Sequence, residues 1–129
     1  MDDDTGAAAS SPAQRKAAAE LIDEARASGR HLIDSLTRLW NGVVEASTMT
    51  NIDDEHDPEG ATVAFERAQL RDMLTRARAD LDDLDRAAER VRTGAYWICE
   101  RCGGPIAPER LTARPTTRVC ITCANKSTR

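Results

Sequence analysis

Apolar residues recur with a helical period along two long stretches of the chain, one on each side of a short polar segment. In the second stretch the steps alternate between four and three residues, through Leu70, Leu74, Ala77, Leu81, Leu84, Ala88 and Val91. This heptad seam is held for three repeats and predicts a helix that packs lengthwise against another helix. Gly94 offers a natural end for that helix.

The first stretch carries a similar stripe, with one doubled step of four that loosens the supercoil. Its members are Leu21, Ala25, Ser28, Leu32, Leu36, Leu39, Val43 and Ala46. Ser11, Pro12 and Gln14 predict its start, because a serine followed three residues later by glutamine is a capping box and proline suits the first helical position. Gly29 interrupts the stripe at a cost of about 1 kcal/mol, and the sequence leaves open whether the helix breaks there.

Two long helices joined by at most ten residues are most simply an antiparallel hairpin. Its tip is then "NIDDEHDPEG", residues 51–60, which has five carboxylates and no Lys or Arg. Such a run is expected to stay in water, and Asp57-Pro58 is suited to start the second helix. We expect Trp40, Met49 and Phe65 to pack inside the hairpin near the bend.

Composition favours long solvated helices over a thick core, since 31% of the chain is charged and only four residues are aromatic. A roomy enzyme pocket is therefore not expected. The acidic start lacks the apolar region of a secretory signal, and no run is apolar enough to span a bilayer, which predicts a cytoplasmic protein without membrane contact. The net charge is −4, so only the basic last 36 residues could hold nucleic acid.

The four cysteines follow the pattern Cys99-x2-Cys102-x17-Cys120-x2-Cys123. Two C-x-x-C turns at this separation predict one tetrahedral Zn2+, and four thiolate ligands leave no open position for catalysis. Two disulfides are disfavoured in a cytoplasmic protein, and a redox C-x-x-C needs no second copy. Tyr96 and Trp97 are expected to cover this zinc module.

The predicted fold class is therefore mainly α: a long antiparallel two-helix coiled-coil hairpin with a small C-terminal four-cysteine zinc module. We expect a disordered acidic N-terminus at 1–11, the hairpin at 12–93, the zinc finger at 94–126 and a tail at 127–129.

Two segments resemble the DksA/TraR family of bacterial transcription factors. They are "DDEHDPEGATVAFERAQL" in the tip and second helix, and "RVRTGAYWICERCGGPIAPERLTARPTTRVCITCANK" around the cysteines. The resemblance implies a non-enzymatic regulator that binds core RNA polymerase, and no sequence-specific DNA binding. In this family the hairpin enters the secondary channel, and the tip acids approach the catalytic centre.

The resemblance also implies which residues face the polymerase. The family tip D-x-x-D-x-A aligns with His56, Glu59 and Ala61, with the nearest aspartate displaced to Asp57. The whole tip set is Asp53, Asp54, Glu55, His56, Asp57, Glu59 and Ala61. Arg76 and Arg114 match basic positions used at the polymerase rim.

Members that respond to the alarmone ppGpp use three basic positions, which here read Asp83, Arg114 and Ala124. Only one basic residue is kept. The sequence therefore predicts weak or absent synergy with ppGpp.

Another function class remains open. The protein could be a zinc-stapled coiled-coil adaptor or a weak nucleic-acid-binding module. Its basic residues would be Arg101, Arg110, Arg114, Arg118, Lys126 and Arg129. Use of the tip acids as the metal site of a nuclease is disfavoured, because an exposed tip offers no pocket to position a substrate.

Overall fold

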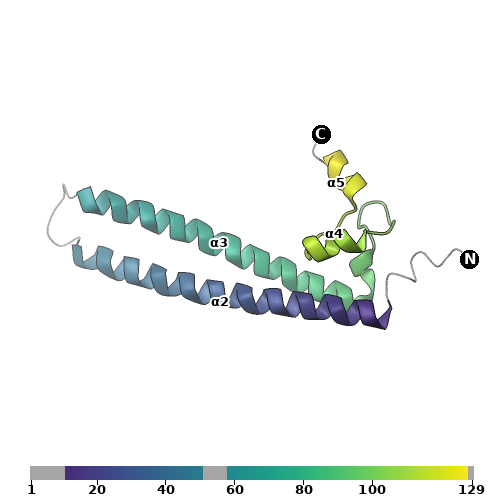
Figure 1. Cartoon of the computed structure of the whole chain (residues 1–129). Helices are drawn as coiled ribbons and strands as arrows, with labels where there is room; N and C mark the ends of the chain where they lie inside the picture. The colour runs from purple at the N-terminus through teal and green to yellow at the C-terminus, as the bar shows by residue number, and fades with distance from the viewer. Residues whose placement is uncertain (1–10, 51–57, 128–129) are drawn as a thin grey trace, which may run out of the picture. The chain divides into compact units, whose positions relative to one another are not determined.

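The computed structural model describes residues 11–50 and 58–127, with side-chain environments for 11–46 and 60–126. Figure 1 shows the elements in chain order: α2 (Pro12–Thr50), α3 (Pro58–Thr93), the 3-10 turn η1 (Ala95–Trp97), α4 (Pro108–Ala113) and α5 (Ile121–Ser127). The described residues form no strand, only an isolated antiparallel bridge between Ile98 and Pro105. The predicted fold class is confirmed: the protein is mainly helical and its two long helices pack against each other.

The predicted start of α2 is confirmed in detail. The Gln14 N–H donates to Ser11 Oγ at 3.2 Å, and the Ser11 N–H donates to Gln14 Oε1 at 3.2 Å. This reciprocal pair satisfies two amides that a helix start otherwise leaves without partners.

The predicted end of α3 is also confirmed. Gly94 has φ +86°, in the left-handed region, and its N–H donates to Val91 O at 3.3 Å. A glycine adopts this conformation without the steric cost that other residues incur.

The chain packs as two compact units, which are described separately. One unit is formed by residues 27–81 and the other by residues 1–26 with 82–129. In the 27–81 unit, Leu36, Leu74 and Ala77 are buried, and three partly buried side chains pack on them: Ile33, Trp40 and Leu70. Residues of α2 and α3 thus share one apolar core in this unit.

The predicted apolar stripe of the first helix is wrong in part. Leu32 and Leu39 are 48% and 56% exposed, and Ser28 and Ala46 are also exposed. The face that packs passes instead through Ala18, Ile22, Ala25, Gly29, Ile33, Leu36 and Trp40. The sequence contains adjacent apolar pairs, Leu21-Ile22 and Leu32-Ile33. From the sequence alone, either member of each pair could lie on the packing face of α2.

Gly29 lies on this packing face and does not break the helix. A Cβ added at Gly29 would lie 3.7 Å from Leu81 Cδ1, an ordinary contact distance. The expectation that Phe65 packs inside the hairpin is wrong, because its side chain is 64% exposed. Phe65 precedes the buried Leu74 by nine residues, or two and a half turns, which puts it on the opposite face of α3.

The other unit has a larger core. Its buried members are Ile22, Leu84, Ala87, Val91, Tyr96, Trp97, Cys99, Ile106, Leu111 and Cys123. Arg26 Nε also donates to Asp85 Oδ1 at 2.9 Å, which joins α2 to α3 within this unit. The cysteine module is therefore packed directly on the helices that share its unit.

Candidate metal centre

The first cysteine pair lies on a tight turn that follows η1. The Cys99 N–H donates to Gly104 O at 2.7 Å, and the Gly103 N–H donates to Cys99 O at 3.0 Å. Gly103 has φ +75°, a conformation that glycine adopts readily. The turn folds the chain back on itself, so that the Cys99 and Cys102 side chains face the same point.

The second pair is positioned by a helix start. Cys120 precedes α5 and Cys123 lies in its first turn, where the Ala124 N–H donates to Cys120 O at 2.9 Å. The segment before Cys120 is fixed from two sides. The Glu100 N–H donates to Arg118 O at 2.9 Å, and Arg110 Nε donates to Val119 O at 3.0 Å.

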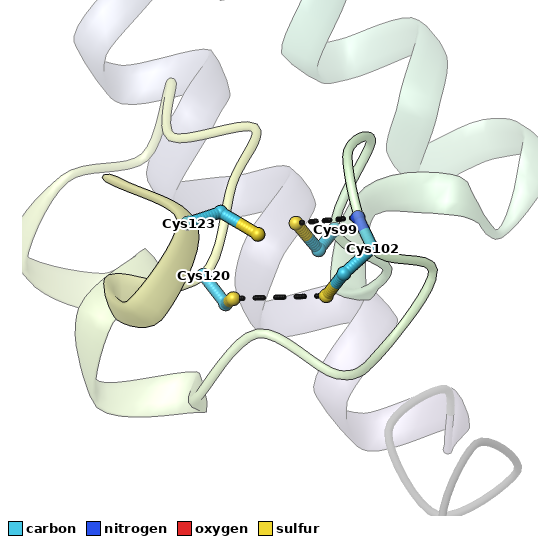
Figure 2. A group of neighbouring side chains, drawn as sticks. All are labelled: Cys99, Cys102, Cys120 and Cys123. Atoms are coloured by element: carbon cyan, nitrogen blue, oxygen red, sulfur yellow. Dashed lines mark hydrogen bonds between the residues drawn. The ribbon is translucent and has the colours of Figure 1, made fainter. Parts of the chain in front are cut away.

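Figure 2 shows the four sulfur atoms turned toward one another. All four Sγ atoms lie within 4.8 Å of each other, and those of Cys102 and Cys120 are 3.8 Å apart. With Zn–S bonds of about 2.3 Å, the sulfurs of a tetrahedral site are separated by about 3.8 Å. The Cys102–Cys120 pair lies at this spacing and the whole set within 4.8 Å, so the four predicted ligands are gathered closely enough to surround one Zn2+, and none is in a disulfide.

Backbone amides stabilise negative charge on Cys99. Burial raises the pKa of the Cys99 thiol, but hydrogen bonds, including those from the N–H groups of Cys102 and Arg101, lower the net pKa to about 6. The two amide nitrogens lie 3.5 and 3.4 Å from Cys99 Sγ. The Gly104 N–H donates to Cys102 Sγ at 3.4 Å.

The pKa values of Cys120 and Cys123, the second pair, are shifted in opposite directions. A hydrogen bond from the Cys123 backbone lowers the pKa of Cys120. Burial, followed by hydrogen bonds with the neighbouring thiols, raises the pKa of Cys123 to about 12. Four thiolates at this spacing need a cation to offset their repulsion, and a bound Zn2+ would supply that charge.

The centre is suited to a structural role. Cys99 and Cys123 are 2% and 7% exposed and belong to the core of their unit. Four cysteine ligands fill a tetrahedral Zn2+, so no position remains for a substrate or a water nucleophile. The protein holds one structural Zn2+ in a four-cysteine site.

Tyr96 and Trp97 join this site to the helices. Both are buried, their rings meet edge to face with centroids 5.1 Å apart, and the Tyr96 hydroxyl donates to Pro115 O at 2.8 Å. Trp97 is only 4% exposed and belongs to the core of this unit.

Sequence reasoning missed Arg90. Its guanidinium donates to Ala95 O at 3.0 Å and Ile98 O at 3.1 Å, and it pairs with Glu100 at 3.0 Å. A basic residue in the last turn of a helix was the only signal in the sequence, and that signal is common to many helix ends.

The predicted polymerase-facing residues are only partly described. Asp53, Asp54, Glu55, His56 and Asp57 lie outside the described residues. Glu59 belongs to α3, and Ala61 is exposed there. Arg76 is exposed on α3 in the 27–81 unit, and Arg114 is exposed after α4 in the other unit.

In the described residues, no helix has the length and apolarity needed to cross a membrane. A mainly helical chain whose last segment folds around four zinc-binding cysteines is a C4 zinc-finger protein. Residues 92–129 match the family model of the prokaryotic dksA/traR C4-type zinc finger.

Relatives extend the match beyond the cysteines. The RNA polymerase-binding transcription factor DksA of Escherichia coli (strain K12) is 30% identical over 119 residues, which cover 87% of this chain and 78% of that protein. The chain therefore belongs to the DksA/TraR family. An uncharacterized protein of Aquifex aeolicus is 44% identical over 59 residues, 45% of this chain and only 41% of that relative's length.

The fold has a solved counterpart. The structure of transcription factor DksA2 from Pseudomonas aeruginosa superimposes with a TM-score of 0.80 at 24% identity, over 95% of this chain and 88% of that one.

Proposed function

We propose that this protein is a non-enzymatic transcription regulator that binds core RNA polymerase directly. The observation that carries the proposal is the match to a relative named as an RNA polymerase-binding transcription factor, because it covers 87% of this chain and 78% of that protein. The filled coordination of a four-cysteine zinc site agrees with a role that involves no chemistry.

In the proposed mechanism, the α2–α3 hairpin enters the secondary channel of the polymerase with residues 51–60 leading. Five carboxylates within seven residues would change the electrostatic potential around a magnesium-bearing, arginine- and lysine-rich active site. The proposed polymerase-facing set is the tip residues with Arg76 and Arg114 at the rim. Both arginine side chains are exposed and so are accessible to a partner.

Weak or absent response to ppGpp is part of the proposal. Asp83 presents a carboxylate, already paired with Arg86 at 3.1 Å, where responsive members have a basic residue. Ala124 is half-buried and carries no charge. Of the three positions that are basic in responsive members, only Arg114 would offer a positive charge to a polyphosphate ligand.

The test combines a pull-down on core polymerase with single-round transcription. The variant Asp57→Asn/Glu59→Gln is expected to bind polymerase like the wild type and to change transcript yield. Asp2→Asn/Asp3→Asn is the matched control, since it removes the same charge from the N-terminal segment, outside the proposed tip. No binding by the wild type refutes the function, and unchanged yield from the bound tip variant refutes the role of these acids.

Addition of ppGpp to the same assay is expected to leave the yield nearly unchanged. A several-fold synergy would contradict the assignment of Asp83 and Ala124.

Weak nucleic-acid binding is a second candidate, favoured by one observation. A concave surface of about 620 Å³ on the zinc-finger unit is lined by four arginines: Arg101, Arg110, Arg114 and Arg118. Retention on DNA that falls steeply with salt, in the absence of polymerase, would support it. Arg118→Ala should then weaken retention and Arg78→Ala, which lies on the other unit, should not.

A further inference from the structure

Trp40 is packed under two guanidinium groups in the 27–81 unit. The Cζ atoms of Arg67 and Arg71 each lie 5.7 Å from the centroid of its ring. The two arginines are four residues apart on α3, so they project from one face of that helix, while Trp40 projects from α2. The contact therefore ties the two helices together.

The stack lies at the end of the buried core. Trp40 and Leu70 pack against Leu36, Leu74 and Ala77, which are the buried residues of this unit. After Trp40 on α2 and before Leu70 on α3, the two helices run toward residues 51–57. None of the described side chains in these two stretches, 41–46 and 60–69, is buried. Apolar packing thus weakens after Trp40, where the described apolar side chains Val43, Val44 and Val63 are at most half-buried.

The arginines take part in this contact at a cost. Like charges four residues apart on a helix repel each other. Neither guanidinium forms an ion pair with a described carboxylate, and Arg67 Nε is buried without a hydrogen-bond partner. Attraction to the face of an indole ring, the strongest aromatic partner for a cation, is the compensating interaction in the described part of the unit.

We propose that Trp40, Arg67 and Arg71 form a positioning clamp, which holds the tip-side ends of α2 and α3 in register. The inference rests on the proposed function in one respect. The clamp would hold the acidic tip in position for the polymerase, but the three clamp residues would not themselves contact the polymerase. Trp40, Arg67 and Arg71 are positioning residues, and the tip acids remain the groups that act.

The test separates the aromatic face of Trp40 from the volume of its side chain. Trp40→Leu keeps an apolar side chain but removes the π face, and Trp40→Phe restores a weaker one. Hydrogen exchange of the zinc-loaded full chain is read at amides 41–46 and 60–67, and again at 84–91 as an internal reference. Trp40→Leu is expected to speed exchange about tenfold at the first set, to leave the reference unchanged, and to be partly rescued by Trp40→Phe.

Arg67→Ala/Arg71→Ala should have the same effect as Trp40→Leu, and the triple variant should add nothing to it, because one interaction is lost in each case. Arg78→Ala, an exposed arginine on the same helix, is the matched control and should leave exchange unchanged. Equal exchange in wild type and Trp40→Leu, or additive effects of the ring and arginine changes, would overturn the clamp.

The polymerase assay then tests the presentation of the tip. Trp40→Leu is expected to retain polymerase binding and to lose several-fold of the effect on transcript yield at saturation, with partial recovery in Trp40→Phe. If Trp40→Leu changes transcript yield as much as the wild type does, the positioning role is overturned and the proposed function stays intact. A wild type without any effect would refute the proposed function, and the exchange measurements would still decide whether the clamp exists.

Discussion

Arg90 and Glu100 form an ion pair that connects the last turn of α3 to the first zinc-binding turn, with 3.0 Å between Nη1 and Oε2. The same guanidinium donates to two backbone carbonyl groups, Ala95 O and Ile98 O. Only 12% of the Arg90 side chain is exposed, against 48% for Glu100. One side chain thus fixes the path of the chain from the end of α3 to Cys99.

Arg90→Ala is expected to lower the free energy of unfolding of the zinc-loaded protein by about 2–3 kcal/mol, because two carbonyls lose a charged donor. Denaturant unfolding followed by circular dichroism would measure the change. Glu100→Gln removes the ion pair alone and should cost less than about 1 kcal/mol, since its carboxylate is half exposed. Equal costs for the two variants would show that the carbonyl hydrogen bonds contribute nothing.

Removal of zinc should affect one unit and spare the other. Cys99 and Cys123 are themselves core residues of the unit that contains Tyr96, Trp97 and Val91, whereas Leu36, Leu74 and Ala77 form a separate core. Structural zinc contributes on the order of 10–16 kcal/mol in small modules. Chelation is expected to abolish the near-ultraviolet dichroism of Tyr96 and Trp97 and to expose amides of 94–126 to exchange.

Amides of 27–46 and 60–81 should stay protected in that experiment, and much of the helical dichroism should remain. Restoring zinc should reverse the loss in the other unit. Cooperative melting of both units on chelation would contradict the separation of their cores.

Two glycines are expected to respond in opposite directions to replacement by alanine. Gly42 lies within α2, and a Cβ there would meet nothing within 4 Å, so Gly42→Ala should stabilise by about 0.5–1 kcal/mol. Gly94 has open space too, but its φ is +86°, and Gly94→Ala should cost about 1–2 kcal/mol. Thermal unfolding of the two variants gives the comparison, and a stabilised Gly94→Ala would show that α3 can end in another conformation.

Local signals in the sequence predicted these elements where few alternatives compete. The capping box of Ser11 and Gln14 forms as expected, because its partners are three residues apart and need no tertiary contact. The cysteine spacing predicted the zinc site for a similar reason, since each C-x-x-C turn orients two ligands locally.

Signals that depend on packing were less reliable. Leu32 and Ile33 are equally apolar, so the periodicity of α2 admits two faces, and only contact with α3 selects Ile33. Trp40 was expected inside the hairpin, but its two arginine partners are ordinary surface residues in the sequence. Long-range contacts of charged side chains leave no periodic trace.

Tyr96 should make the protein sensitive to alkali. Burial raises the pKa of its hydroxyl, and the positive charge of Arg90 only partly opposes this shift. A pKa that is higher in the folded than in the unfolded state stabilises the fold below the ordinary tyrosine pKa of about 10, and this stabilisation is lost as the pH rises through the folded-state pKa. Tyr96 is the only tyrosine, so the absorbance of its phenolate reports the titration directly.

The midpoint of the Tyr96 titration is expected at a higher pH in the folded protein than in denaturant. The free energy of unfolding should fall as the pH rises between these two midpoints. Tyr96→Phe should cost about 1 kcal/mol at neutral pH, because Pro115 O loses its donor, and should flatten the alkaline decline. The difference between the two proteins isolates the hydroxyl, since their other titrating groups are the same. Equal alkaline slopes in wild type and variant would show that the folded protein does not resist ionisation of Tyr96.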